Sequence, residues 1–309
     1  RSTRVRSSAA SDVFKRQTKR HHTFFEMMGN FSIGDYFKDE AIEFAYELLT
    51  SKDWFDIPKE KLYVTVYTND ADAYNKWVEV GMPRDHIIKL EGNFWEIGEG
   101  PCGPDSEIFF DQGEKLDPSD DAWEKFINDE EQDRYVEIWN NVFSQYNSKP
   151  GIPREKYQEL PHKNIDTGAG LERWACIFQG VESNFETDLF KPIIEKIEEL
   201  SGVLYNGEVA FKVIADHMKA VTFAISDGAS FGNTGRDYVL RRLVRRSVRF
   251  GRKLGFKEPF LYKLVPTIVK VMGEAYPELK ANSGEVAVYI LDEEKLFFNT
   301  LEDGERRLK

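Results

Sequence analysis

A carboxylate and a guanidinium flank a short glycine-rich run in the middle of the chain. The run reads DTGAGLER at 166–173, and an apolar helical pattern continues from it through Trp174. Glycine lets the backbone approach a ligand closely or adopt a positive φ, and the following helix fixes the direction of Arg173. Amides at a helix start suit anions, and a guanidinium suits a phosphate or the face of a ring. The run predicts a nucleotide or phosphate site, with a plain strand-to-helix turn and a salt bridge as the alternative.

A second candidate lies near the start of the chain, where RHHTFFEMMGNFSIGDYF occupies 20–37. Residues 22–28 contain no breaker and are expected to form a strand. One face of such a strand would carry Arg20, His22, Phe24 and Glu26. This face would offer a cation, an aromatic ring and a carboxylate to one ligand. The adjacent histidines could instead bind a metal, although no other His or Cys lies at ligand spacing nearby.

A Gly/Pro-rich segment, EGPCGP at 99–104, is expected to form a shaped loop. It leads into a strand that carries Glu107 and Asp111. Carboxylate oxygens are preferred ligands of magnesium, so Glu107 at the mouth of an ATP site would be a natural ligand. The alternative is that Glu107 is a solvated residue at a strand end.

The periodicity of the remaining sequence predicts an α+β protein. Up to Phe190, strands, a glycine turn and helices follow one another, which suits an antiparallel sheet backed by helices. The expected helices there are 38–50 and 70–80, and the expected strands are 62–67, 86–90 and 135–147. After Phe190 the pattern is almost wholly helical. The expected helices there are 191–200, 211–226, 236–254, 259–273 and 284–309.

One of these helices is basic, although the chain has a formal net charge of −12 and a pI of about 5.1. Nine Lys or Arg residues lie between Arg236 and Lys257. An apolar stripe places the arginines on the flanks of the helix. A solvated charged face is one reading, and a surface for the phosphate backbone of an RNA is the other. The arginines expected to contact RNA are Arg241, Arg242, Arg245 and Arg246.

The bulk properties limit the class of protein. A chain of 309 residues is long enough for two domains, and its acidity excludes a generally polycationic nucleic-acid binder. Two cysteines at unrelated spacing suit a reducing compartment. No apolar run approaches the ~20 residues of a membrane span. These features predict a cytoplasmic protein without a membrane partner.

Residues 1–17 are basic and Ser-rich, and we interpret them as a disordered or non-native arm on a fragment that starts without Met.

Taken together, these motifs resemble the catalytic portion of the alanyl-tRNA synthetase family, a class II aminoacyl-tRNA synthetase family. Residues 20–37 are similar to the second half of its motif 2, and residues 166–173 are similar to its motif 3. Between and after them come GPCGP at 100–104, WNNVF at 139–143, VIADH at 213–217 and YVLRR at 238–242. The likeness covers about 18–309. It implies a catalytic domain at 18–190, truncated at its N-terminus, and an incomplete helical tRNA-recognition domain at 191–309.

The resemblance implies an alanine–tRNA ligase that uses ATP and Mg2+. Arg20 would hold the γ-phosphate of ATP, Phe24 would stack on adenine, and Arg173 would close the other face of the base. Glu107 is the candidate magnesium ligand. The carboxylate of L-alanine would attack the α-phosphorus and release pyrophosphate, and alanine would then pass to the 3′ end of tRNA(Ala). Arg20 and Arg173 would act by neutralising charge.

For the amino acid, the resemblance implies that Asp166 binds the ammonium group of L-alanine. Trp139 and Gly168 would line a pocket for the methyl group. Such a pocket discriminates weakly against glycine, because one methylene is worth only ~1–3 kcal/mol. The zinc of this family belongs to an editing segment that this chain lacks, so none is expected here.

The sequence departs from the family pattern at several places. Residues 1–17 do not match motif 1 or the first strand of motif 2, so the chain as it stands could lack activity. Asp105 stands where the family has a second cysteine, and Asp237 stands where Gly is common. Two alternatives stay open: a synthetase-like ATP- or RNA-binding protein without aminoacylation, and another ATP-dependent carboxylate-activating enzyme of the same superfamily.

Overall fold

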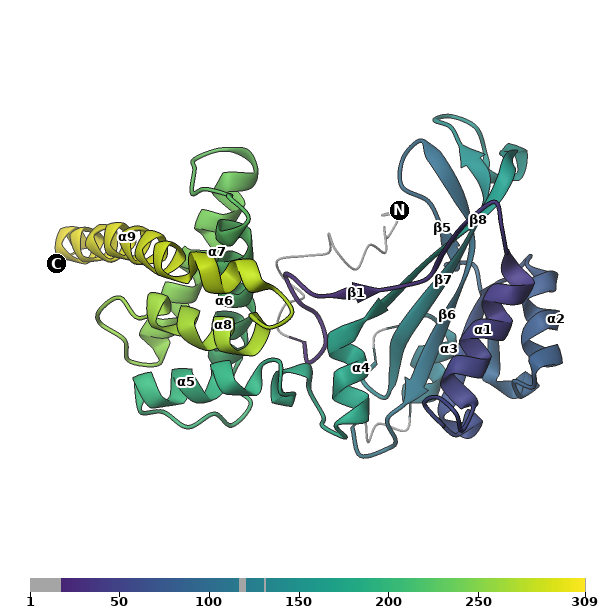
Figure 1. The fold of residues 1–309 in the computed structure, drawn as a ribbon, viewed down its shortest axis with the longest axis horizontal. Helices are drawn as coiled ribbons and strands as arrows, with labels where there is room; N and C mark the ends of the chain where they lie inside the picture. Colours follow the sequence, from purple (N-terminus) through teal and green to yellow (C-terminus); the bar gives the residue numbers. More distant parts are fainter. Residues whose placement is uncertain (1–17, 117–120, 131, 309) are drawn as a thin grey trace. The chain divides into compact units, whose positions relative to one another are not determined.

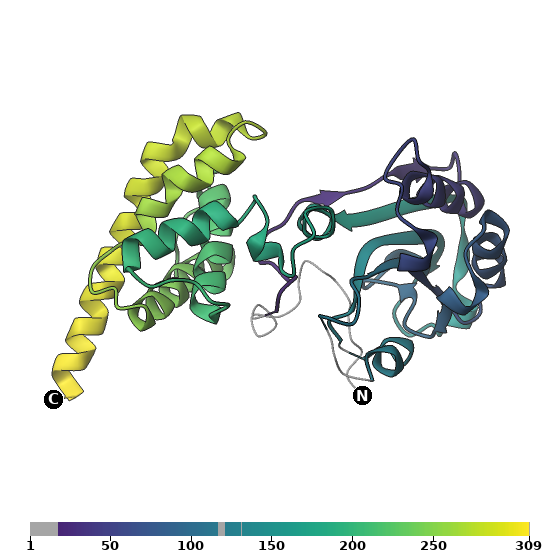
Figure 2. The same cartoon turned by 90° about the horizontal axis from the view of Figure 1, so that it is seen from below.

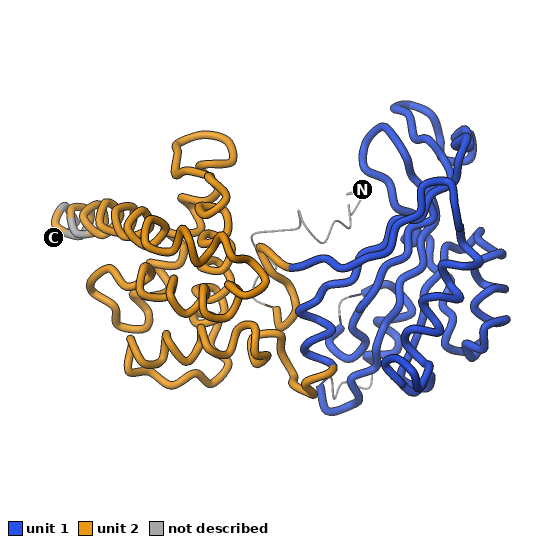
Figure 3. Tube along the Cα trace, in the orientation of Figure 1, with its two compact units in different colours: residues 1–7, 26–177 blue, residues 8–25, 178–309 orange. Residues whose placement is uncertain are grey.

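The computed structural model describes residues 18–116, 121–130 and 132–308, so the expected arm at 1–17 lies outside the described residues. The chain divides into two compact units, coloured in Figure 3. The sheet unit comprises 26–177. The helical unit comprises, among the described residues, 18–25 and 178–308. The helical part thus begins before the expected boundary at 190, because Phe185 and Phe190 belong to its core.

The sheet unit is built on one mixed sheet, whose strands follow the order β1-β8-β7-β6-β3-β4 (Figure 1). In addition, β2 pairs with β8 and β5 pairs with β6. All pairings are antiparallel except that of β3 with β4. The strands are β1 (Met27–Met28), β2 (Phe31–Ile33), β3 (Leu62–Tyr67), β4 (Ile87–Leu90), β5 (Phe94–Trp95), β6 (Gly100–Asp111), β7 (Tyr135–Ser148) and β8 (Gln158–Gly170).

The helices confirm most of the sequence-based expectations. In the sheet unit they are α1 (Lys38–Thr50), α2 (Ala71–Val80), α3 (Ala122–Ile127) and α4 (Leu171–Phe178). In the helical unit they are α5 (Lys191–Ser201), α6 (Val209–Ser226), α7 (Gly235–Lys253), α8 (Val265–Met272) and α9 (Pro277–Leu308). Short 3-10 turns complete the chain: η1 (Lys59–Lys61), η2 (Arg84–His86), η3 (Arg154–Lys156), η4 (Asn184–Glu186) and η5 (Leu261–Leu264).

One face of the sheet is covered by α1, α2 and α4. Apolar residues at helical spacing on α1, such as Ala41, Ala45 and Leu49, are buried there. They pack in one cluster with Ile108 of β6 and Phe143 of β7. Figure 1 shows α1 and α2 next to each other beside the strands. The opposite face carries the polar side chains of Thr65, Glu107 and Asn140, and next to them Phe109 packs on Phe126 of α3.

Three expectations about local structure are wrong. Residues 22–28 form no strand apart from β1, because carboxylates take the place of strand partners: Asp216 accepts the N–H of Thr23, and Glu172 accepts the N–H of Glu26. The run at 100–104 is part of β6 rather than a loop. A Cβ at Gly103 would lie 1.9 Å from the carbonyl oxygen of Phe143, so glycine permits the close approach of β6 to β7. The glycine turn is the end of β8, and α4 starts directly after it.

The helical unit packs around α6, which is buried along most of its length. Phe211, Ile214 and Met218 of α6 have no exposed surface. The long helix α9 runs along this unit and contacts α6, α7 and α8 (Figure 2). The Glu294 carboxylate on α9 accepts backbone N–H groups of Phe260, at 2.9 Å, and of the next two residues at the start of η5.

A buried ion pair joins the starts of α1 and α2. Lys38 Nζ lies 2.6 Å and 2.7 Å from the two carboxylate oxygens of Asp70, which also caps α2 at Ala73 N. Lys38→Met would leave the buried charge of Asp70 unpaired, so we expect the free energy of unfolding to fall by about 3–5 kcal/mol. All six tryptophans lie in the sheet unit, so urea unfolding followed by their fluorescence measures this unit.

The control for Lys38→Met is the double variant that also carries Asp70→Asn. Asparagine keeps the helix cap but removes the unpaired charge. The double variant should recover part of the lost stability. A double variant as unstable as Lys38→Met would show that the ion pair is not the cause.

Burial raises the pKa of Glu294 to about 7, even though three N–H groups favour the charged form. A carboxyl whose folded pKa exceeds its unfolded value holds a proton in the fold that the unfolded chain has lost. Its contribution to stability is therefore complete at low pH and falls by roughly 3 kcal/mol between about pH 4.5 and about pH 7. Glu294→Gln should abolish this slope.

The measurement is urea unfolding of both proteins followed by far-UV circular dichroism across this pH range. The difference between them isolates Glu294 from other titrating groups. If the difference does not change with pH, the amide donors rather than burial govern this carboxyl.

Candidate active site

The polar face of the sheet is built by strand register. Thr65 on β3 pairs with Glu107 on β6, Glu107 pairs with Asn140 on β7, and Asn140 pairs with Gly168 on β8. Paired residues on neighbouring strands point to the same side of a sheet. These four residues therefore form one row across the sheet. We call the side of the sheet that carries this row the polar face.

A second row lies two residues away on the same face. Asp105 pairs with Val142, and Val142 pairs with Asp166. The structure thus brings three of the predicted residues, Glu107, Asp166 and Gly168, to one face. They come from β6 and from the end of β8.

Hydrogen bonds hold the carboxylates of the polar face in place. Thr65 Oγ1 donates to Glu107 Oε2 at 3.3 Å, and Asn93 Nδ2 donates to Thr65 Oγ1 at 2.8 Å. Asn140 Nδ2 donates to Asp105 Oδ2 at 2.8 Å. Glu107 is only 5% exposed, which contradicts the alternative of a solvated strand-end residue.

Arg173 reaches the polar face from α4. Its Nη1 donates to the Glu137 carbonyl oxygen at 2.8 Å and lies 3.2 Å from the Glu137 carboxylate. Glu137 pairs with Phe109, which lies two residues from Glu107 on β6. A Cβ at Gly170 would lie 3.7 Å from the stem of Arg173, so the side chain passes over this glycine. One edge of the guanidinium is held, and its direction is fixed.

Asp166 and Gly168 differ in their solvent exposure. Asp166 is exposed, yet partial desolvation raises the pKa of its carboxyl above the ordinary value. A Cβ at Gly168 would lie 2.8 Å from Met27 Sδ, so the Met27 side chain covers this position. Met27 is half exposed and borders the space over the glycine.

Trp139 does not join these residues. It pairs with Ile108, one position away from Glu107 and Asn140 in the register, and so points to the helix-covered face. There its ring meets Trp174 of α4 at a centroid distance of 5.8 Å. The expectation that Trp139 lines one pocket with Gly168 is corrected by this alternation.

Two predicted ATP-binding residues, Arg20 and Phe24, belong to the helical unit. The Arg20 carbonyl oxygen accepts a long hydrogen bond of 3.5 Å from Asn184 Nδ2. The Phe24 ring lies 4.7 Å from the Phe223 ring of α6 and is partly buried. Since 22–26 is not a strand, the expected shared face of Arg20, His22, Phe24 and Glu26 does not exist.

The four predicted RNA-binding arginines fall into different environments on α7. The Nε atoms of Arg241 and Arg245 lie 3.0 Å and 3.5 Å from Glu293 Oε1, and Glu293 is 4% exposed. These two arginines therefore serve the packing of α7 against α9. Arg242 is exposed, with its guanidinium 5.9 Å from the Tyr238 ring.

Arg246 lies between these extremes. Burial, and then the neighbouring charge of Arg242, lower the pKa of its guanidinium. The carboxylate of Asp216 on α6 acts in the opposite direction. Arg246 therefore interacts electrostatically with a buried acid of its own unit.

Sequence reasoning missed several residues of the polar face. They are Thr65, Asn93, Asp105 and Asn140. The alternation of Asp105 with Glu107 was a signal in the sequence, but the Gly/Pro-rich run before it concealed the strand. Asn140 could be found only from its register with Glu107, because neighbouring asparagines on a strand point to opposite faces.

A magnesium site is only partly formed by the described residues. Glu107 offers a buried oxygen ligand, and within 18–116, 121–130 and 132–308 no group of three His, Cys, Asp or Glu side chains could hold a metal. Magnesium commonly takes one or two carboxylates and completes its shell with phosphate oxygens and water. Glu107 fits that incomplete donor set.

The fold and this face define a class II tRNA synthetase, and the chain belongs to that family. The family profile described as tRNA synthetases class II (A) matches residues 16–309. Among curated relatives, the alanine–tRNA ligases of Streptococcus pneumoniae and Streptococcus sanguinis are each 56% identical over 304 residues, which cover 97% of this chain. That of Streptococcus mutans is 55% identical over 307 residues and 98% of this chain. Each alignment spans 35% of the relative, so the chain has about a third of their length.

Along the part of the chain that the structure describes, no helix combines the length and apolarity needed to span a membrane.

Two α7 arginines allow a matched test of whether Arg241 stabilises the fold and the exposed Arg242 does not. Arg241→Gln would weaken the pairing of the buried Glu293, so we expect a loss of about 1–3 kcal/mol in the free energy of unfolding. Arg242→Gln changes an exposed side chain and should stay within about 0.5 kcal/mol of the wild type. Urea unfolding followed by far-UV circular dichroism measures both. Equal losses for the two variants would contradict the assignment.

Proposed function

We propose that this chain carries the amino-acid-activating part of an alanine–tRNA ligase. The observation that carries the proposal is the polar face, where Asp166, Gly168 and Glu107 share one side of the sheet with the tethered Arg173. Membership of the class II tRNA synthetases implies ATP, magnesium and tRNA as general requirements. The alanine–tRNA ligases among the relatives support alanine as the amino acid.

The polar face suits the chemistry of activation. The exposed carboxylate of Asp166 would bind the ammonium group of L-alanine. Met27 covers Gly168, and the two residues would form one wall of the pocket for the methyl group and limit larger side chains. The alanine carboxylate oxygen would then attack the α-phosphorus of ATP, the bond to the leaving pyrophosphate would break, and alanyl-adenylate would form. Positioning and charge neutralisation account for most of the rate in such phosphorus chemistry.

Two residues of the sheet unit would hold the nucleotide. Arg173 presents a planar guanidinium that could stack on adenine, since Glu137 holds only one of its edges. Glu107 would hold a magnesium ion that neutralises charge on the phosphates. For Arg20 and Phe24 of the helical unit, the family resemblance supports contacts with the γ-phosphate and with adenine.

Transfer to tRNA(Ala) would use the basic helix α7. We assign the contact with RNA mainly to its exposed arginines, because Arg241 and Arg245 are engaged by Glu293. The exposed ones are Arg236, Arg242 and Arg249. Such contacts position the RNA through its phosphates without reading its sequence. Aminoacylation of tRNA would take place in the cytoplasm. It would require no zinc in this chain.

The experiment that tests the proposal is alanine-dependent exchange of pyrophosphate into ATP. It should be run on this chain and, in parallel, on the whole protein as the cell makes it. Exchange with alanine, and much less with serine or glycine, is the expected result. If neither protein exchanges with any amino acid, the proposal is wrong, and a synthetase-like protein that binds ATP or RNA without aminoacylation becomes the better account.

Asp166→Asn tests the ammonium-binding role. Loss of the charge–charge interaction should raise the KM for alanine by about tenfold or more and leave the KM for ATP nearly unchanged. Trp139→Phe is the matched control, because Trp139 packs on the other face, and its KM for alanine should equal that of the wild type. An equal rise in both variants would place Trp139 back in the pocket.

A further inference from the structure

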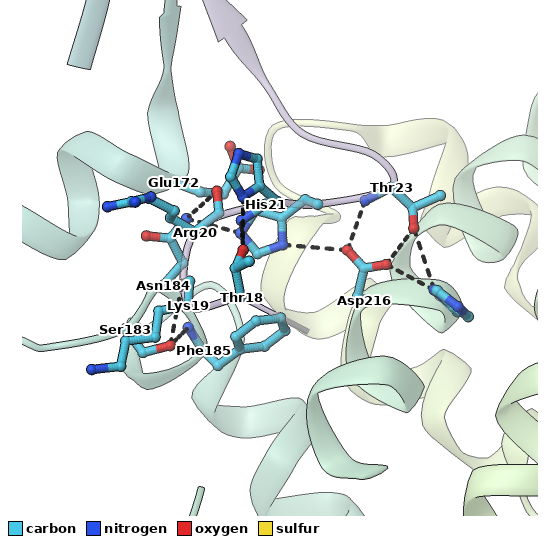
Figure 4. A network of polar contacts seen from close by, with 12 residues as sticks. Thr18, Lys19, Arg20, His21, Thr23, Glu172, Ser183, Asn184, Phe185 and Asp216 are labelled. Carbon is cyan, nitrogen blue, oxygen red and sulfur yellow. Dashed lines mark hydrogen bonds and ion pairs between the residues drawn. The ribbon is translucent and has the colours of Figure 1, made fainter. Parts of the chain in front are cut away.

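The segment that carries Arg20 and Phe24 is held by side chains of its own helical unit. The Lys19 carbonyl oxygen accepts from Asn184 N at 3.0 Å and from Ser183 Oγ at 3.2 Å (Figure 4). Further along, Thr23 N donates to Asp216 Oδ1 at 2.8 Å. The segment is therefore fixed without strand pairing, on both sides of Arg20.

Asp216 is the centre of this arrangement. It lies on α6, is 1% exposed, and accepts a second hydrogen bond from the Thr23 hydroxyl. Its oxygens also lie 3.3 Å from His22 Nδ1 and 2.8 Å from His217 Nδ1. Burial alone would raise the pKa of Asp216, but the hydrogen bonds from His217 and His22 outweigh it and hold this pKa far below its usual range. Asp216 is therefore a buried charged acceptor with several donors.

His22 is oriented by the same acid. Its Nε2 lies 2.9 Å from Asn184 Nδ2, and its ring stacks on Phe190 at a centroid distance of 4.7 Å and an angle of 11°. With the amide donating to Nε2, the ring carries its proton on Nδ1 and donates it to Asp216. Two consecutive residues, His22 and Thr23, thus depend on one carboxylate.

We propose that Asp216 is a positioning residue for ATP, acting through Thr23 and His22 on the direction of Arg20 and Phe24. The inference rests on the proposed function. Hydrogen bonds to a charged group contribute about 1.5–3 kcal/mol each, so two bonds to Thr23 are enough to select one backbone conformation. The same helix also contacts the Phe24 ring through Phe223. A small displacement of groups that position a substrate, such as Arg20 and Phe24, lowers the reaction rate strongly.

Thr23 allows a nearly isosteric test of the mechanism. Thr23→Val removes the hydroxyl donor and keeps the shape, whereas Thr23→Ser keeps the donor. In pyrophosphate exchange with the whole protein, we expect Thr23→Val and Asp216→Asn to raise the KM for ATP by about tenfold, since one lost bond of this kind is worth that factor or more. The KM for alanine should not change, and Thr23→Ser should behave as the wild type.

Two further variants separate positioning from general damage. If Asp216 acts through Thr23, the double variant of Asp216→Asn and Thr23→Val should be less impaired than the product of the single effects. Thr222→Val is the matched control, since Thr222 is buried on the same helix at 1% exposure and no described hydrogen bond joins its hydroxyl to the segment. It should leave the KM for ATP unchanged.

Hydrogen–deuterium exchange gives a readout that does not depend on activity. Asp216→Asn should speed exchange of the Thr23 amide by about tenfold or more, because this amide donates to the carboxylate. A wild-type KM for ATP and wild-type protection of Thr23 in this variant would overturn the inference. If the wild type itself shows no pyrophosphate exchange, the proposed function fails. The inference for ATP fails with it, and protection of Thr23 then shows only whether Asp216 holds the segment.

Discussion

The register among β3, β6, β7 and β8 is the constraint on which the candidate site depends. Side chains alternate between the two faces of a sheet, so a slip of one residue would send Glu107 and Gly168 into the apolar cluster under α1 and α2. The buried apolar residues on the opposite face prevent that slip, because Ile108 and Phe143 would then be exposed to water. The polar face is thus stabilised by burial that occurs on the other side of the sheet.

A second constraint comes from buried carboxylates that hold irregular backbone. Asp216 accepts the N–H of Thr23 in the helical unit. In the sheet unit, both carboxylate oxygens of Glu172 lie 3.2 Å from the N–H of Glu26, and Glu172 is 1% exposed. Backbone that has no strand or helix partner must satisfy its groups otherwise, and here two acids do so. Asp216 bonds Thr23, the neighbour of Phe24, and Glu172 directly precedes Arg173. Phe24 and Arg173 are both predicted ATP-binding residues.

The basic helix α7 shows why counting charges is a weak guide to a surface. Nine Lys or Arg residues lie between 236 and 257. The geometry divides them, because Arg241 and Arg245 share the buried Glu293, whereas Arg242 remains exposed. A charge that neutralises a buried acid is needed for packing, whereas an exposed arginine such as Arg242 is available to an anionic partner.

The sequence by itself determined the class of fold, nearly all helices and the strands β3, β4 and β7, because the apolar periods of α1, β3, β7 and α6 are strong local signals. It also determined Asp166, Glu107 and Arg173 as candidates, since their motifs are contiguous. Only the tertiary structure decided which face each strand residue takes, and it removed Trp139 from the pocket. It also decided that the first residues of the segment at 20–37 are held by side chains and not by a strand. Such outcomes depend on register and on partners far away in the chain, such as Asp216, which local patterns do not encode.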